Sequence, residues 1–510
     1  MGREVEFKFV LPAAALRRAE RIAWLRRMAT DGMTRSNIDS TYFDTKRCKL
    51  RRHGVTLRIR KAASKRVQTI KGANGASVGR FEQEDEVRQN RPQLEHARGT
   101  PLAPLAGKKL GKRLRPVFST KVRRAVLPVR FRTSDIEVAF DRGRLVAGRH
   151  SEPIHELELE LKRGCPEDAA ALGRRLAGAL PLAFGALSKS ERGYALRTGQ
   201  REEPTRAGPI FLASGQSCGS AFAQIGLSCL RHVAANENAV LAGDPEGIHQ
   251  MRVGIRRLRA AMSLFRDIAG GRDVDAVKRD LKWLAGELGP ARDLDVLASE
   301  ALIPLRRSNP GEPEVALLEK KVKHDRTVEL HNARAAVAGA RFRHIILSTA
   351  LWLLDGDWLR VETGAIAHDR ERPIGRAAER ILERRSRKII KKAKRLSELD
   401  GRRRHKLRIA VKKVRYGCGF FASLYGHRRR QRQYGDALKR LQGCLGKLND
   451  MRVHADRAHE VANPRRRAAG QPQAAYAMGL LTGREQADQK QAVAQAIKAG
   501  RKLAAMPAFW

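Results

Sequence analysis

The chain has 510 residues, of which 42% are hydrophobic, so it is long enough for two or more domains with substantial cores. It carries 103 lysine and arginine residues against 54 aspartate and glutamate residues, and this net charge of +49 predicts a polyanionic partner such as nucleic acid, an acidic membrane or polyphosphate. Only 5% of the residues are aromatic, which disfavours single-stranded nucleic acid because its bases stack on aromatic side chains.

The remaining composition excludes several other classes of protein. The six cysteines are scattered and none forms a C-x-x-C pair, so neither a zinc site nor a disulfide framework is predicted. The first residues are charged and strand-like, unlike a signal peptide. No uninterrupted apolar run is long enough to span a bilayer. We therefore expect a cytoplasmic protein without membrane contact.

The chain opens with an alternating segment at 2–9, GREVEFKF. Successive side chains of a strand point to opposite faces, so Glu4, Glu6 and Lys8 share one face and apolar residues share the other. Neighbouring carboxylates repel each other, and a hard cation such as Mg2+ relieves this repulsion while it binds phosphates. Taken alone, the segment also fits a half-exposed surface strand.

Further segments of the first half repeat this alternation. Their polar positions are Thr56, Arg58 and Arg60; Thr69 and Lys71; Arg80, Glu82, Glu84 and Glu86; Ser119, Lys121 and Arg123; Glu137 and Asp141; and Glu156, Glu158, Glu160 and Lys162. An ordinary sheet with one face in water explains any single strand. The whole set, which mixes acids with bases, fits better as a closed antiparallel barrel with a charged lumen and an apolar outside covered by helices.

Two helices are available to cover such a barrel. Proline is favoured near a helix start, so we predict helices from Pro12 to Arg27 and from Pro166 to Leu180. The segment 91–116 is punctuated by Gly and Pro, which predicts a short helix or a loop excursion.

A lumen lined with both signs of charge suits a phosphate chain. Arginine and lysine bind phosphoryl oxygens, and glutamates hold metal ions that bridge them. Phosphoryl transfer needs mainly positioning and charge neutralisation around the transferred group. An inward carboxylate could also orient the attacking water.

This ordered set of motifs, together with Lys189-x-x-Arg192-Gly193-Tyr194, resembles the CYTH domain of the triphosphate tunnel metalloenzymes over residues 1–198. The resemblance implies an eight-stranded antiparallel tunnel that binds a triphosphate and cleaves it with Mg2+ or Mn2+. It implies catalytic roles for Glu4, Glu6 and Lys8, and metal ligation by Glu4, Glu6, Glu158 and Glu160. The implied triphosphate-binding residues are Lys8, Arg58, Arg60, Lys71, Lys121, Arg123, Lys189 and Arg192.

The second half begins after a linker at 199–212, which is rich in Gly, Pro and charge. From 213 to 510 the pattern is helical and contains an internal repeat. The segment 249–259 returns at 405–415, and the segment 288–296 returns at 445–453 with nearly the same spacing. This predicts duplication of one helical unit.

Each copy of the repeat carries a stripe of cations. Positions i, i+3, i+7 and i+10 of a helix share one face, and they are His249, Arg252, Arg256 and Arg259, then His405, Arg408, Lys412 and Arg415. The opposite face should be core: Met251, Ile255, Leu258, Met262 and Phe265, then Leu407, Val411, Val414, Cys418 and Phe421. The stripes contain no acid, and like charges destabilise a helix. We therefore expect a bound anion rather than a solvated face, with the histidines as either anion donors or buried structural groups.

This half resembles the CHAD domain, which implies two pseudo-symmetric helical bundles whose basic surface binds inorganic polyphosphate. The implied contacts are His249, Arg252, Arg256, Arg257, Arg259, His405, Arg408, Lys412, Lys413 and Arg415. The second copy departs from the first at Arg452, where the first has Asp295.

Together the resemblances imply an α+β tunnel domain followed by an all-α domain. The expected function is hydrolysis of inorganic triphosphate to diphosphate and phosphate, with polyphosphate binding by the helical half and polyphosphate granules as a possible location. Alternative substrates are thiamine triphosphate and nucleoside triphosphates, including cyclisation of ATP. A different class is a non-catalytic polyphosphate scaffold, although a site that only binds anions gains nothing from glutamates. Nucleic acid is expected to bind only non-specifically.

Overall fold

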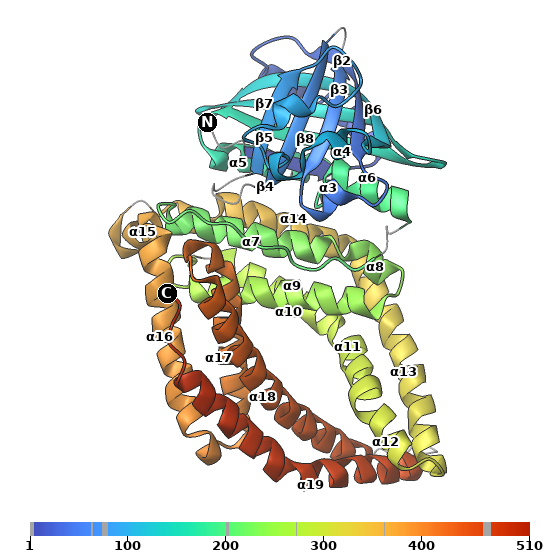
Figure 1. Ribbon diagram of the computed structural model, residues 1–510, viewed down its shortest axis with the longest axis vertical. Helices are drawn as coiled ribbons and strands as arrows, with labels where there is room; N and C mark the ends of the chain where they lie inside the picture. Colours follow the sequence, from blue (N-terminus) through green and yellow to red (C-terminus); the bar gives the residue numbers. More distant parts are fainter. Residues whose placement is uncertain are drawn as a thin grey trace. The chain divides into compact units, whose positions relative to one another are not determined.

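The structure is a computed structural model that describes residues 5–62, 65–73, 80–199, 203–271, 273–361, 363–462 and 471–510. The chain forms two compact units (Figure 1). The sheet unit comprises Met1–Thr205, Leu230–Ala242 and Ala340–Arg360, and the helical unit comprises Arg206–Cys229, Gly243–Gly339 and Val361–Trp510. An antiparallel sheet with covering helices, followed by a mostly helical region, confirms the predicted fold class.

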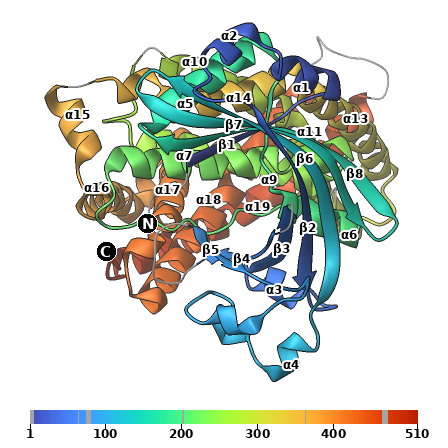
Figure 2. The same ribbon diagram turned by 90° about the horizontal axis from the view of Figure 1, so that it is seen from above.

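The sheet unit is built on one antiparallel sheet of strand order β5-β4-β3-β2-β6-β7-β8-β1-β9 (Figure 2). The strands are β1 (Val5–Val10), β2 (Thr34–Asp44), β3 (Thr56–Ala62), β4 (Lys65–Ala73), β5 (Arg80–Glu86), β6 (Arg115–Phe131), β7 (Ser134–Ala147), β8 (His150–Arg163) and β9 (Ala183–Phe184). In the part of the chain that is described, β5 and β9 are free edges, so strand pairing does not close the expected barrel. The short β9 pairs with the free edge of β1, the edge that would have to pair with another strand to close a barrel.

One face of the sheet is apolar and packs against helices. Phe7 and Phe9 of β1 and Leu159 of β8 are buried there beneath α1 (Ala13–Ala19), α2 (Ala23–Arg27) and α5 (Pro166–Ala179). The predicted helix at 12–27 is thus two helices, whereas the helix at Pro166 is confirmed. Their packing explains why every second residue of β1 and β8 is apolar.

A late segment of the chain completes this core. Helix α14 (Ala340–Asp355) belongs to the sheet unit, although residues 340–360 were expected in the helical half. Its Leu347 and Leu351 join the same buried cluster. Gly173 of α5 gives room to Phe9 of β1, since a Cβ built there would lie 3.1 Å from the Phe9 ring, whereas its 3.5 Å distance from Leu351 would be an ordinary contact.

The outer face of β3 and β4 has its own cover. The predicted excursion at 91–116 forms η1 (Leu94–Ala97), η2 (Ala103–Leu105) and α4 (Lys108–Gly111). Leu102 and Leu110 pack with α3 (Lys49–Arg52) against Leu57, Ile59 and Ile70. Both apolar regions lie on the same side of the sheet. The charged residues lie on the other side, which we call the inner face.

Helix α6 (Lys189–Thr198) packs on the inner face at one end. Ser188 caps it through a capping box with Glu191, which fixes the start of the helix. Tyr194 packs near Phe118 of β6, and Gly193 allows this contact, because a Cβ there would lie 2.2 Å from the Phe118 ring. This packing brings Lys189 to the charged part of the inner face.

The chain beyond residue 205 is helical. Its helices include α7 (Cys218–Ala234), α8 (Glu237–Leu241), α9 (Pro245–Leu264), α10 (Asp273–Glu287), α11 (Gly289–Val296), α12 (Ile303–Ser308), α13 (Pro313–Ala338), α15 (Gly364–Glu371), α16 (Ile374–Lys394), α17 (Gly401–Phe420), α18 (Arg428–Ala462) and α19 (Gln471–Ala504). The stripe residues lie on α9 and α17, which Asp244 and Asp400 cap at their N-termini. All ten residues predicted as the core face of these helices are buried, which confirms that prediction.

The two copies of the repeat differ after the stripe helix. In the first copy the chain breaks between α10 and α11, where Pro290 stands near the start of α11. In the second copy Lys447 takes the place of proline and α18 continues through 35 residues. Proline lacks the N–H of the helical ladder and clashes with the preceding turn, which accounts for the difference.

No single helix among the described residues is long and apolar enough to cross a membrane; only the consecutive segments Pro313–Ala338 and Ala340–Leu359 meet the length and composition test, and they do so as a bent pair.

Candidate functional site

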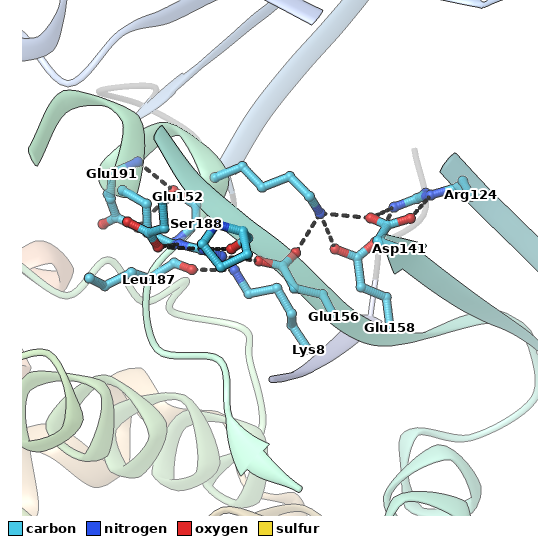
Figure 3. A network of polar contacts seen from close by, with 12 residues as sticks. Lys8, Arg124, Asp141, Glu152, Glu156, Glu158, Leu187, Ser188 and Glu191 are labelled. Atoms are coloured by element: carbon cyan, nitrogen blue, oxygen red, sulfur yellow. Dashed lines mark hydrogen bonds and ion pairs between the residues drawn. The ribbon is translucent and has the colours of Figure 1, made fainter. Parts of the chain in front are cut away.

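Three buried carboxylates of β7 and β8, Asp141, Glu156 and Glu158, lie close together (Figure 3). They converge on the ammonium of Lys189. Its Nζ lies 2.8 Å from Asp141 Oδ2, 2.6 Å from Glu156 Oε2 and 2.8 Å from Glu158 Oε1. Strand register explains the cluster, because Asp141 is paired with Glu156, and Glu158 follows two residues later on the same face. We call Asp141, Glu156 and Glu158 the acidic hub.

Two arginines also bind the acidic hub. Arg124 of β6 donates from Nε to Asp141 Oδ1 at 2.7 Å and from a terminal nitrogen to Glu158. Arg192 of α6 donates to Glu156 Oε1 at 2.6 Å. Each hub carboxylate therefore contacts at least two cationic groups, as a buried charge requires.

This environment shifts the pKa values of Glu158 and Lys189. Burial opposes ionisation of Glu158, but Lys189 and then Arg124 outweigh it and lower the pKa of Glu158 to about 2. Burial likewise opposes the charge on Lys189, yet Glu158, Glu156 and Asp141 raise its pKa above the ordinary value. Glu158 and Lys189 are thus held as an ion pair.

Lys8 of β1 lies beside the hub. Its register partner on β8 is Glu158, and its ammonium donates to the backbone oxygen of Leu187. Burial lowers the pKa of Lys8, against the opposing effect of Glu156. The buried ammonium of Lys8 therefore lies where β1 meets α6.

A second set of carboxylates lies at the next inward-facing positions along the same strands. The register sets Glu6 of β1 opposite Glu160 of β8, and Glu160 opposite Glu137 of β7. Lys162 Nζ lies 2.6 Å from Glu160 and 3.1 Å from Glu137. We call Glu6, Glu137 and Glu160 the carboxylate row; its members are more exposed than the hub.

The other arm of the sheet presents cations together with acids. Arg58 and Arg60 of β3 and Lys71 of β4 share the inner face with Glu82 and Glu84 of β5. Lys71 lies 2.5 Å from Glu82, whereas the nearest Arg60–Glu84 and Arg58–Glu84 distances are 3.5 and 3.8 Å. The Nε atom of Arg58 is buried and has no hydrogen-bond partner among the described residues. These arginines are therefore only loosely paired.

The structure brings together most of the predicted tunnel residues but not all of them. Glu4 lies outside the described residues. Lys121 and Arg123 alternate with Arg124 along β6 and so lie on the opposite face from the hub. Sequence reasoning missed Arg124 as a site residue because the run 121–124, KVRR, offers a base on either face.

The acidic residues fit a divalent metal. One oxygen from each hub carboxylate lies within 4.8 Å of the others, a spacing that could hold an ion. Lys189 contacts all three hub carboxylates, and Lys162 lies between Glu137 and Glu160 of the carboxylate row. Carboxylate oxygens are the ligands that Mg2+ prefers.

In the helical unit, the two predicted stripes come together because α9 packs against α17. Arg256 of α9 is close enough to Lys412 of α17 to lower its pKa, after burial and Arg408, to about 8. The Nε atoms of Arg252, Arg256, Arg408 and Arg415 are buried and, within the part of the chain that is described, have no hydrogen-bond partner. The stripes thus form one cationic surface with spare donors.

Acids from neighbouring helices approach the stripes only at their margins. Arg252 lies 3.6 Å from Asp293, and Arg408 lies 3.9 Å from Asp450, at matching positions of the repeat. These are long contacts, and Asp293 is 62% exposed, so they neutralise the stripes weakly.

The histidines of the stripes differ from each other. Burial and then Arg292 lower the pKa of His249, which favours its neutral form. His405 instead forms a hydrogen bond with Asn449 of α18.

Other predicted polyphosphate contacts point elsewhere. Arg257 lies over the Phe420 ring at 5.4 Å, and Lys413 donates to Ser263 Oγ at 2.9 Å. Lys413 also lies near Arg259 and near Arg385 of α16, which sequence reasoning did not single out. Arg257 and Lys413 therefore do not share the face where Arg256 and Lys412 meet.

A CYTH family model matches residues 2–194, and a CHAD family model matches residues 224–459. The charged inner face and the striped helices thus belong to these two kinds of domain, and the chain is a two-domain CYTH–CHAD protein. The crystal structure of the CHAD domain from the plant Ricinus communis is 31% identical, with a TM-score of 0.51, and the match covers 60% of this chain and 98% of that one.

Two further proteins are similar to parts of the chain. An inorganic triphosphatase of Haemophilus influenzae is 32% identical over 169 residues, which are 32% of this chain and 47% of that protein. The chain therefore spans about half the length of this curated relative. A Hippeastrum protein with a dominant triphosphatase activity is 20% identical, with a TM-score of 0.28, over 39% of this chain and 96% of that one.

Proposed function

We propose that the sheet unit hydrolyses inorganic triphosphate to diphosphate and phosphate with Mg2+ or Mn2+. The observation that carries this proposal is the inner face, which holds loosely paired arginines on β3 together with acidic residues on β1, β7 and β8. The arginines suit phosphoryl oxygens, and the acids suit a metal that neutralises the transferred group. The similarity to an inorganic triphosphatase supports the substrate.

Within this proposal, Glu6, Glu158 and Glu160 hold the metal, together with Glu4. Bound there, the metal supplies charge neutralisation and orients the phosphate chain. Arg58, Arg60, Lys71 and Lys8 bind the triphosphate. Lys189 and Arg192 bind the carboxylates of the acidic hub and so orient them, and Arg124 takes part in place of Lys121 and Arg123.

The test is phosphate release from inorganic triphosphate, ATP, thiamine triphosphate and long-chain polyphosphate, each with and without Mg2+. Glu6→Gln should abolish metal-dependent release and leave polyphosphate binding intact. Arg21→Gln is the control, because Arg21 is exposed and lies outside the inner face. Normal hydrolysis by Glu6→Gln would overturn the metal assignment, and a preference for ATP or thiamine triphosphate would change the substrate. No hydrolysis of any compound would favour a polyphosphate scaffold.

We further propose that α9 and α17 bind inorganic polyphosphate. The buried Nε groups of the stripe arginines support this, because unsatisfied donors next to like charges are costly unless an anion meets them. Replacing Arg252, Arg256, Arg408 and Lys412 with Ala should remove polyphosphate retention and preserve triphosphate turnover. Loss of both activities would mean that the two units act on one substrate. Binding of polyphosphate would also place the protein at polyphosphate granules in the cytoplasm.

A further inference from the structure

The outer face of the sheet, opposite the inner face, carries cations between its two apolar regions. Lys121 and Arg123 of β6 lie there, next to Arg142 and Arg144 of β7. We call these four residues the outer band. Along β6 the outer band is followed by Ala125, which is buried beneath the covering helices. Lys121, Arg123 and Arg144 are exposed, so this part of the outer face has no apolar cover.

The strand register of the outer band sets like charges directly against each other. Arg123 pairs with Arg142, and Lys121 pairs with Arg144. Like charges at directly opposite positions of an antiparallel pair destabilise the sheet. Neighbouring strands lie about 4.8 Å apart and alternate residues of one strand about 6.8 Å apart, so the cations form a compact array of two columns and two rows. An anion bound across the array would remove this repulsion.

Acids compensate the outer band only in part. Arg142 donates to Glu20 Oε1 at 2.9 Å. Lys121 and Arg123 form neither an ion pair nor a side-chain hydrogen bond with any residue that the structure describes, although Asp39 of β2 is the register partner of Lys121. The outer band therefore keeps most of its positive charge and suits an anionic partner.

The side chains around the outer band are small and polar. Asn37 of β2 lies opposite Arg123, and Ser151 of β8 accepts from Arg144 at 2.9 Å. Among the described residues, none of the exposed large apolar side chains lies on β2, β6, β7 or β8. Protein interfaces usually contain aromatic anchors, membrane-surface elements insert apolar side chains, and single-stranded nucleic acids stack their bases on aromatic rings. Surfaces that bind the backbone of a nucleic acid duplex use arginine, lysine and small polar side chains instead.

We propose that the outer band binds the phosphate backbone of a nucleic acid duplex without reading its base sequence. A duplex spreads its phosphates over two strands, which suits cations in two columns, whereas a single phosphate chain suits a line of cations. DNA and RNA duplexes share this backbone chemistry. The outer band lies on the opposite face from the proposed catalytic residues, so this inference does not depend on hydrolysis in the sheet unit.

The test is fluorescence anisotropy of the full chain with labelled short duplexes of DNA and of RNA. Lys121→Gln combined with Arg123→Gln should weaken binding about tenfold and lower the slope of log K against log salt concentration by about two, one for each lost phosphate contact. Lys46→Gln combined with Arg47→Gln is the matched control, because it removes the same two charges from exposed residues just after β2. Equal losses in the two double variants would show that only the net charge matters and would overturn the proposal, as would a failure of both duplexes to bind.

Charge-preserving variants and other ligands complete the test. Lys121→Arg combined with Arg123→Lys keeps both charges and should bind duplexes as the unchanged protein does; weakened binding would contradict backbone contacts made through charge.

The same comparison is repeated with single strands, long-chain polyphosphate and vesicles of anionic phospholipid. A loss with any of these that equals or exceeds the loss with duplexes would assign the outer band to that ligand and overturn the proposal. The difference between the double variants should persist when the stripe residues Arg252, Arg256, Arg408 and Lys412 are replaced with Ala; its disappearance would assign duplex binding to the stripes. Binding of either duplex at the outer band supports the proposal, and the tighter of the two identifies the source.

Discussion

Lys189 Nζ lies 2.6 Å from Glu156 Oε2, so a residue of α6 neutralises a strand carboxylate that is fully buried. The same ammonium reaches the other two hub carboxylates. The contacts of Lys189 therefore join the start of α6 to strands β7 and β8.

Removing the ammonium should destabilise the sheet unit. Lys189→Met leaves three buried carboxylates with Arg124, Arg192 and the nearby Lys8, and breaking a buried ion pair typically costs about 3 kcal/mol or more. Lys162→Met is the control, because Lys162 pairs with carboxylates at a more exposed site and its loss should cost about 1 kcal/mol or less. Urea unfolding of both variants measures the difference. Equal losses would show that the hub does not anchor α6.

The stability of the sheet unit should fall on acidification. Glu158 has a pKa of about 2 in the folded protein against an ordinary value of 4.5, so the unfolded chain binds the proton first as pH falls. The stabilisation is complete above the ordinary value and should be lost progressively from about pH 5 to about pH 2. Unfolding at a series of pH values measures this slope. Glu158→Gln should flatten it, and an unchanged slope would assign the effect to other acids.

Adding one methyl group at Gly193 should displace α6. The new Cβ would lie 2.2 Å from the Phe118 ring, which cannot yield as a flexible side-chain end would. Overpacking of this kind costs about 1–3 kcal/mol, so Gly193→Ala should lower stability and triphosphate turnover together. Gly178→Ala in α5 is the control, because a Cβ there meets nothing within 4 Å and should leave stability unchanged or raise it by up to about 1 kcal/mol. Normal turnover in Gly193→Ala would separate α6 from the proposed site.

Polyphosphate binding should take up protons at mildly alkaline pH. Lys412 has a pKa of about 8 because burial and then Arg408 and Arg256 disfavour its charge. An anion on the stripes would reverse that effect and raise the pKa, so binding near this pH should take up as much as about one proton per site. Calorimetry in buffers of different ionisation enthalpy measures the uptake. Lys412→Arg, which stays charged throughout, should abolish it; uptake that persists would come from another group.

Local patterns predicted much of this architecture. Alternation identified β1 and β8 and their polar faces, because one buried face imposes a period of two. Helical spacing identified the core faces of α9 and α17 for the same reason, with a period near 3.6. The sequence thus predicts which residues are buried wherever one side of a helix or strand is apolar.

Other features depend on partners that local patterns do not reveal. Strand β2 (Thr34–Asp44) went unrecognised because polar residues fill its first half and burial is concentrated near Tyr42 and Phe43. In the run 121–124 a shift of one residue exchanges the two faces, so only the pairing of Arg124 with Asp141 shows which base faces inward. The meeting of Arg256 with Lys412 likewise depends on how two distant helices pack.

The place of α14 in the sheet unit affects how the protein is made. Leu347 and Leu351 complete the apolar core of strands that leave the ribosome some 200 residues earlier in the chain. During synthesis the nascent sheet must wait, with part of this surface uncovered, while the intervening segment 243–339 of the other unit emerges. The chain therefore has a vulnerable interval in translation, when chaperone protection or a slow codon run would matter most.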